Sequence, residues 1–264
     1  MRFAMIKEQE RETACFVTSR GLMKIEIFNE IKRTEWGTDI ETLIAKDHIP
    51  QLVRWYRAGG RDVIDIMIKS IIPFDKVIYA PLFKKAPKVL GEENETKVQE
   101  TSDSQSRITV LGCGDEINLA EAEAKVTCRA ALGAVMGKSS SELRGENFLS
   151  CAAAFTSVLE VTHKDRAGAF ERNNEKFFSM GPQLITSDEI SDISALSVQI
   201  VRNGTVTGEN GAEASDPSPS DAAAWNEGDI ILTYGGRAIE LKAEGTVECR
   251  ITGFPSLINK ISAN

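Results

Sequence analysis

Apolar and polar residues alternate in short runs over the first thirty residues of the chain. The segments RFAMI, TACFVTS and LMKIEIF are predicted to be short strands. Between residues 38 and 71 the apolar positions recur at the three- to four-residue spacing of helices. TDIETLIAK begins with a Thr or Asp cap, and IPQLVRWYRAGG ends at two glycines. DKVIYAPL is predicted to be a strand that leaves this region.

The remainder of the chain is richer in strand patterns. We expect strands at RITVLG, KVTCRAALGAVMG, ALSVQIVRNG, GDIILTYGG and TVECRITGF, and a helix continuing into a strand at SSELRGENFLSCAAAFTSVLEV. Residues 91–107 hold a single aliphatic residue, Val98, and are predicted to be a solvated loop or linker. Because helices do not alternate regularly with strands, an α+β, mostly β fold is favoured over a doubly wound parallel sheet.

The overall charge argues against a nucleic-acid partner. The 264 residues carry a net charge of −8, with a pI of about 5.1, so no basic field would gather phosphates. No apolar run reaches the roughly 18–20 residues of a membrane span. The first residues lack the apolar core of a signal peptide, and the five cysteines show no pairing pattern. We therefore expect a cytoplasmic protein with reduced thiols, in which Cys128 and Cys151 are small core residues.

Several familiar motifs are incomplete in this chain. LGCGDEI begins like a dinucleotide fingerprint, but Ile117 stands where the third glycine would be. GAVMGKS has three residues between its glycines where a phosphate loop needs four. The two histidines have no cysteine at a zinc-site spacing, and no G-x-S-x-G elbow marks a nucleophilic serine.

Six stretches together resemble the fumarylacetoacetate hydrolase (FAH) superfamily. LGCGDEI is similar to its G-x-G-D-x-I turn, and AALGAVMGK to its A-E-L-A-V-V-I-G-K strand. The segment ENFLSCAAAFTSVLEVTHKDR is similar to the helix and strand that follow. The segments beginning at FFSMGPQLITSDEI, EGDIILTYGG and LKAEGTVECRITGF match later motifs in the right order. The resemblance covers most of residues 107–264, and FDKVIYAPLFKKAPKVL resembles the entry to that domain.

The resemblance implies a twisted β-roll domain at residues 75–264, a small N-terminal α/β domain at residues 1–74, and a homodimer. Many members of such a family use Mg²⁺ or Mn²⁺ to hold a 2-oxo acid or acylpyruvate. They then hydrolyse a C–C bond, decarboxylate, isomerise or hydrate. The divalent ion prefers carboxylate ligands and stabilises the enolate that forms when a bond beside a carbonyl breaks.

The residues at the site depart from the family pattern. When Gly114-Asp115 and Gly137-Lys138 are aligned without a gap, the Glu-x-Glu ligands fall on Arg129 and Ala131. The third ligand, an Asp, falls on Glu160. The lysine before the G-P turn falls on Arg172, and Glu175 lies near a family Asp. The family His and Glu that act as acid and base belong in residues 95–102, where Gln99 and Ser102 stand nearest.

Two hypotheses follow from this pattern. In the first, the metal-dependent C–C chemistry is lost or repurposed and no cofactor is expected. Arg129 then takes the place of the metal beside Glu160, and Arg172 and Glu175 line a pocket for a small anionic ligand. In the second, the chain is an active Mg²⁺- or Mn²⁺-dependent hydrolase, decarboxylase, isomerase or hydratase of a 2-oxo acid. Its relocated ligands would be Glu160, Glu121 and Glu123, although the last two also fit a solvated loop.

Overall fold

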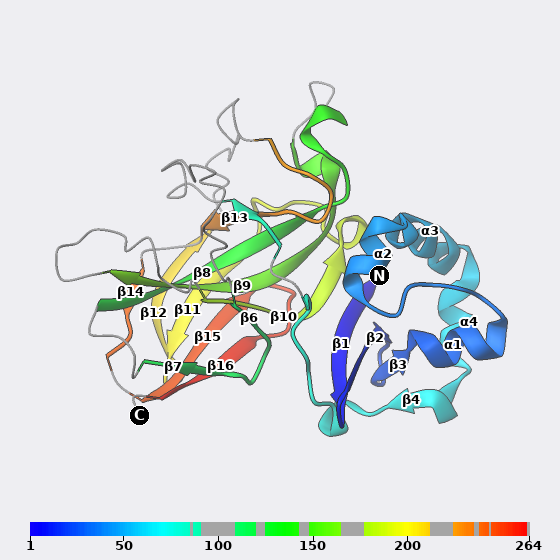
Figure 1. Cartoon of the computed structure of the whole chain (residues 1–264), viewed down its shortest axis with the longest axis horizontal. Helices are drawn as coiled ribbons and strands as arrows, with labels where there is room; N and C mark the ends of the chain where they lie inside the picture. Colours follow the sequence, from blue (N-terminus) through cyan, green and yellow to red (C-terminus); the bar gives the residue numbers. More distant parts are fainter. Residues whose placement is uncertain are drawn as a thin grey trace.

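Two β-sheets form most of the molecule, as Figure 1 shows for the computed structural model. The structure describes residues 1–84, 87–90, 109–119, 125–142, 148–164, 177–211, 224–234, 238–242 and 244–262. Within these residues strands predominate over helices, so the predicted α+β, mostly β class is confirmed.

The larger sheet runs through both the N-terminal and the C-terminal parts of the chain. Its strands are β1 (Arg2–Glu8), β2 (Arg11–Val17), β3 (Leu22–Lys24), β4 (Ile71–Ile72), β5 (Val89–Leu90), β6 (Thr109–Leu111), β8 (Lys125–Met136), β9 (Ala152–Lys164), β10 (Phe177–Thr186), β13 (Ile230–Tyr234) and β14 (Ile239–Glu240). Their order is β4-β3-β2-β1-β10-β9-β8-β13-β5, with β14 beside β8 and β6 beside β10.

The smaller sheet packs against the middle of the larger one. Its strands are β7 (Glu116–Asn118), β11 (Ser197–Arg202), β12 (Thr205–Gly211), β15 (Gly245–Ile251) and β16 (Leu257–Ser262), in the order β12-β11-β15-β16-β7. The apolar core between the sheets joins residues of β8 and β9 to residues of β11, β15 and β16. This packing fixes one face of β8 and β9 against the smaller sheet.

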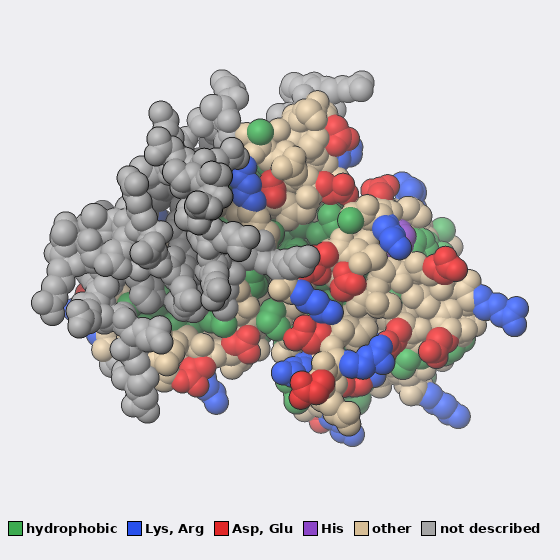
Figure 2. Space-filling model, in the orientation of Figure 1, with side chains coloured by type: hydrophobic (Ala, Val, Ile, Leu, Met, Phe, Trp, Pro, Cys, Tyr) green, Lys and Arg blue, Asp and Glu red, His purple; other side chains and the backbone are tan. Residues whose placement is uncertain are grey.

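The N-terminal region adds helices beside its strands (Figure 1). They are α1 (Ile25–Lys32), α2 (Ile40–Ala45), α3 (His48–Trp55) and α4 (Arg61–Asp65), with a kink at Tyr56–Gly60 between the last two, where the backbone of Ala58 and Gly59 is not helical. The predicted cap of TDIETLIAK is confirmed, because the Asp39 carboxylate accepts a hydrogen bond from the Thr42 N–H at 2.7 Å. On the face in Figure 2, Lys and Arg side chains of this region are interspersed with Asp and Glu side chains.

The predicted strand LMKIEIF is only half correct. Its first three residues form β3, but α1 begins at Ile25. Ile25 and Phe28 are both buried and lie three residues apart, as on one side of a helix. The ring of Phe28 lies 5.5 Å from that of Phe16 on β2, in an edge-on arrangement. This tertiary contact outweighs the local alternation that favoured a strand.

Two other predicted elements also differ in the structure. DKVIYAPL forms no regular strand. It follows β1 through the hydrogen bonds from the Lys7 N–H to the Ile78 carbonyl (2.9 Å) and from the Ala80 N–H to the Met5 carbonyl (3.0 Å). Pro81, which has no N–H to donate, comes directly after these contacts. The described residues before β9 form 3₁₀ turns at Ser140–Glu142 and Phe148–Cys151 instead of the expected helix.

The N-terminal region is joined to the rest of the chain by strand pairing. β1 pairs antiparallel with β10, through Arg2 with Ile185 and Phe3 with Leu184. The Arg57 guanidinium also lies 2.9 Å from the Asp188 carboxylate. A domain boundary between residues 74 and 75 stays a prediction, and any such boundary is crossed by a continuous sheet.

The helices and the cysteines can also be compared with the predictions made from the sequence. Among the helices of the described residues, none has the length and apolar character needed to cross a bilayer. All five cysteines are free thiols, and Cys128 and Cys151 are buried in the core as predicted.

Candidate functional site

The pair of long strands β8 and β9 has two faces with different contents. Residues 126, 128, 130, 132, 134 and 136 of β8 point into the core between the sheets. Ala131 and Val135 point to the opposite face, together with Ala154 and Val158 of β9. This division follows from the two-residue repeat of a strand. The family's ligand positions 129, 131 and 160 all belong to the second face.

Arg129 and Glu160 are direct cross-strand partners. The register of β8 and β9 pairs these two residues, so their side chains leave the sheet on the same side with Cβ atoms about 5 Å apart. Glu160 is buried, with 6% of its surface exposed, and Arg129 is partly buried. Because a buried carboxylate is costly without a charged partner, this register supports the predicted association of the two groups.

Apolar side chains lie beside Glu160 toward β10 and in the next row along the strands, whereas Thr127 and Thr162 form the row on its other side. The next strand, β10, places Phe178 directly beside Glu160, and β6 places Val110 beside Phe178. The neighbouring row of the same face consists of Ala131, Val158 and Met180, all with 0% exposure. Glu160 thus has hydrocarbon side chains on two sides, and electrostatic attraction is stronger beside them than in water.

Sequence analysis missed a second carboxylate on this face. β14 pairs with β8 so that Glu240 lies opposite Thr127 and therefore diagonally across from Arg129. Ile239 beside it packs into the core between the sheets, which confirms that Glu240 points the other way. Glu240 also lies 3.0 Å from the Lys242 ammonium. The short segment Ile239–Glu240 carries no motif, and its register alone places it near the site.

The side chains at these positions do not fit a divalent metal ion. Mg²⁺ and Mn²⁺ need several oxygen ligands, whereas position 129 supplies a guanidinium and position 131 a methyl group. The fixed positive charge of Arg129 would lie in register with Glu160, the one ligand position that remains acidic. Within the described part of the chain, no three His, Cys, Asp or Glu side chains cluster as a metal site would require.

Other predicted site residues lie outside the described residues. These are Arg172 and Glu175, and the alternative ligands Glu121 and Glu123. The positions nearest the family's acid–base pair, Gln99 and Ser102, are also outside them. The structure therefore places Arg129 opposite Glu160, and the roles of all the predicted site residues stay predictions.

The LGCGDEI turn is held by its own hydrogen bonds. The Gly112 N–H donates to the Asp115 carboxylate at 2.7 Å. The Asn259 amide donates to the Gly112 and Asp115 carbonyls at 2.9 and 3.0 Å. A side chain at Gly112 would come within 2.8 Å of the Pro81 nitrogen. The turn therefore joins β6, β7, β16 and the segment around Pro81 that lies beside β1, which explains its glycine, its aspartate and the asparagine near the C-terminal end.

Sequence comparison agrees with this architecture. The profile of the fumarylacetoacetate (FAA) hydrolase C-terminal domain matches residues 93–262. The chain belongs to the fumarylacetoacetate hydrolase family. The human mitochondrial oxaloacetate tautomerases FAHD2B and FAHD2A are each 23% identical to it over 175 residues. The match includes 58% of this chain and 56% of each relative, so the chain spans about half the length of these curated relatives.

Solved structures confirm the FAH fold over nearly the whole chain. Maleylpyruvate hydrolase from Sphingobium sp. SYK-6 superimposes with a TM-score of 0.71 and 16% identity, covering 99% of both chains. A structure of that hydrolase holds manganese(II) and pyruvate. The 5-carboxymethyl-2-hydroxymuconate delta-isomerase from Mycobacterium smegmatis superimposes with a TM-score of 0.66 and 16% identity, again covering 99% of both chains. These FAH-fold proteins share the backbone arrangement with this chain.

Proposed function

We propose that this chain is a metal-independent member of the FAH family that binds a small carboxylate anion, with the guanidinium of Arg129 in the place of the divalent ion. The register pairing of Arg129 with the buried Glu160 is the observation that carries the proposal. Relatives and fold neighbours named for 2-oxo acid chemistry support a carboxylate as the ligand class.

Arg129 has the donors for both partners at once. A guanidinium offers five N–H donors in one plane, so one edge can hold the Glu160 carboxylate while another donates two hydrogen bonds to an incoming carboxylate. The hydrocarbon side chains of Phe178 and Val158 strengthen such contacts because they exclude water. Arg172, at the lysine position of the family, would add a second positive charge for the anion.

The same arrangement limits the chemistry. C–C cleavage beside a carbonyl requires stabilisation of an enolate, to which a divalent ion contributes several kcal/mol. A single guanidinium already facing Glu160 provides less charge, and Gln99 and Ser102 stand nearest the places where the family has its acid–base His and Glu. We therefore infer that metal-dependent hydrolysis, decarboxylation or isomerisation of 2-oxo acids is lost, and that the pocket binds its ligand without turning it over.

Calorimetry of the protein in EDTA tests the proposal with oxalate as the probe. Oxalate should bind to the unmodified protein, and Arg129→Gln should abolish the binding heat. Arg250→Gln is the matched control, because Arg250 is exposed on the smaller sheet and pairs with Glu248 at 3.0 Å. This control should bind oxalate like the unmodified protein.

A metal titration gives a readout that needs no variant. Electron paramagnetic resonance of Mn²⁺ mixed with the unmodified protein should show only the free ion at millimolar protein. Tight Mn²⁺ binding, or oxalate binding that requires Mg²⁺ or Mn²⁺, would contradict the proposal. Either result would favour the alternative of an active Mg²⁺- or Mn²⁺-dependent enzyme with relocated carboxylates. Metal-dependent decay of oxaloacetate above the rate in buffer would favour it too.

We also infer a homodimer, because isologous pairs are the commonest protein oligomers and the family resemblance implies one. Sedimentation equilibrium at micromolar concentration should give twice the chain mass of 28.9 kDa. A single species of 28.9 kDa would refute the dimer and leave the proposed anion site unaffected.

A further inference from the structure

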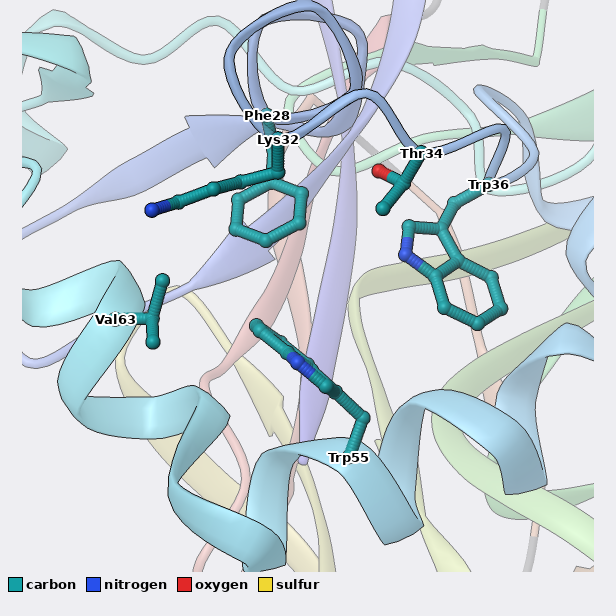
Figure 3. A pocket seen from close by; sticks show the side chains of 6 residues that line it. All are labelled: Phe28, Lys32, Thr34, Trp36, Trp55 and Val63. Carbon is teal, nitrogen blue, oxygen red and sulfur yellow. The ribbon is translucent and has the colours of Figure 1, made fainter.

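We propose that a cavity in the N-terminal region binds a small planar aromatic molecule carrying one negative charge, such as an aromatic carboxylate. The cavity lies between the end of α1, the segment after it, and helices α3 and α4 (Figure 3). Its lining consists of Phe28, Lys32, Thr34, Trp36, Trp55 and Val63. None of these residues belongs to the Arg129 face, so the inference is independent of the function proposed above.

The size and walls of the cavity fit one aromatic ring system. Its volume of about 290 Å³ is near the lower limit of small-molecule sites in proteins. Phe28, Trp36, Trp55 and Val63 provide apolar surface on several sides, and the three aromatic residues approach the space from different elements. Aromatic rings favour offset or edge-on contact with another ring, so a flat aromatic ligand gains contact on more than one side.

The walls are held in place before any ligand arrives. The rings of Phe28 and Trp55 lie 5.2 Å apart, and those of Trp36 and His48 are also 5.2 Å apart, both edge-on. His48 is itself fixed, because its Nδ1 accepts the Gly37 N–H at 3.0 Å. A Cβ at Gly60 would lie 2.5 Å from the Trp55 ring, so the backbone closes directly on that indole. Such preorganisation lowers the entropy lost on binding.

The polar groups around the cavity are donors. Figure 3 shows the Trp36 indole nitrogen facing the space between the rings, and the Lys32 side chain extending on the side of Val63. In the described part of the chain, neither the Lys32 ammonium nor the Trp36 Nε1 has a hydrogen-bond or ion-pair partner. The Thr34 hydroxyl already donates to Asn29 Oδ1 at 2.8 Å. These two donors, one of them cationic, match the acceptor oxygens of an anionic group.

Indole N–H signals in a ¹H–¹⁵N spectrum of the full chain provide the test. The chain has three tryptophans, and Trp225 serves as the internal reference because its Nε1 donates to the Lys138 carbonyl at 3.1 Å in another part of the fold. Addition of 1-naphthoate should shift the Trp36 and Trp55 signals and leave the Trp225 signal in place. The neutral isostere 1-naphthamide should cause the same shifts only at higher concentration.

A charge-removing variant separates the role of Lys32 from that of the apolar walls. Lys32→Met keeps the length of the side chain and should weaken 1-naphthoate binding by about fivefold, the upper range of one exposed charge pair. Binding of 1-naphthamide should not change. Lys69→Met is the control, since Lys69 is exposed on a neighbouring 3₁₀ turn and does not line the cavity. It should leave both affinities unchanged.

Three outcomes would overturn the inference. The first is an absence of shifts at Trp36 and Trp55 with millimolar 1-naphthoate. The second is equal affinity for naphthoate and naphthamide in the unmodified protein. The third is a shift of the Trp36 signal that follows protein concentration without ligand, because the cavity would then be covered by a second copy of the chain.

Discussion

The two faces of the β8–β9 pair share one backbone and one register but have opposite chemistry. On the face toward the smaller sheet, Cys128, Leu132 and Leu159 join a hydrocarbon core. On the other face, the row of Arg129 and Glu160 places two opposite charges among apolar neighbours. Strand pairing can hold either kind of face, because the hydrogen bonds between strands join backbone groups and do not involve the side chains. The stability of each face depends on a different interaction, which mutations can separate.

The largest effect is expected on the apolar face. Leu159 is fully buried opposite Ala130, so Leu159→Ala should lower the free energy of unfolding by about 4 kcal/mol through lost burial and the cavity left behind. Urea denaturation measures this change. Leu159→Ile, which conserves volume and suits a strand, should cost less than about 1.5 kcal/mol. Equal losses for the two variants would mean that this face is not tightly packed.

The next largest effect is expected on the charged face. Arg129→Met should lower the free energy of unfolding by about 3 kcal/mol, because Glu160 would stay buried without its cation. Adding Glu160→Met should restore most of the loss, since a buried ion pair can be exchanged for hydrocarbon at little cost. Urea denaturation of the unmodified protein, both single variants and the double variant measures the coupling. Additive losses would show that the two residues do not interact.

A third variant converts the charged face toward a metal site. Arg129→Glu with Ala131→Glu would place two carboxylates beside Glu160 on one sheet face. Mn²⁺ at one hundred times its dissociation constant should then stabilise the variant by about 2.7 kcal/mol, seen as a rise in Tm. The matched variant with Gln at both positions should show no rise, and neither should the unmodified protein. If Mn²⁺ also raised the Tm of the unmodified protein, Arg129 would not be taking the place of the divalent ion.

The smallest effect concerns the thiols of the apolar face. Burial raises the pKa of Cys249 to about 12 and also raises that of Cys128, so neither is a thiolate at pH 8. Both should resist a disulfide reagent at that pH until the protein unfolds, whereas the partly exposed Cys113 should react first. Thiol labelling with mass spectrometry checks this order. Fast labelling of Cys128 in the native protein would show that the two sheets separate.

The candidate site was only partly predictable from the sequence. The positions of Arg129, Ala131 and Glu160 came from motif spacing, because β8 has no insertion between its flanking glycine turns. Whether Arg129 lies opposite Glu160 depends on the register of two strands separated by a connecting segment, and a shift of one residue would put the two side chains on different faces. Glu240 reaches the same face from a two-residue strand that no local pattern distinguishes.

Local sequence determined the class of fold, the family, the long strand β8 and the Asp39 cap, because each depends on a short-range pattern or on motif order. Tertiary contacts decided where those patterns ended. Packing of the Phe28 ring against Phe16 and Trp55 stabilises a helix in the second half of LMKIEIF. Pairing of β1 with β10 merged the N-terminal strands into the larger sheet. The aromatic cavity and the Arg129–Glu160 row arose in the same way, since both join residues that are distant in sequence and meet only when the chain folds.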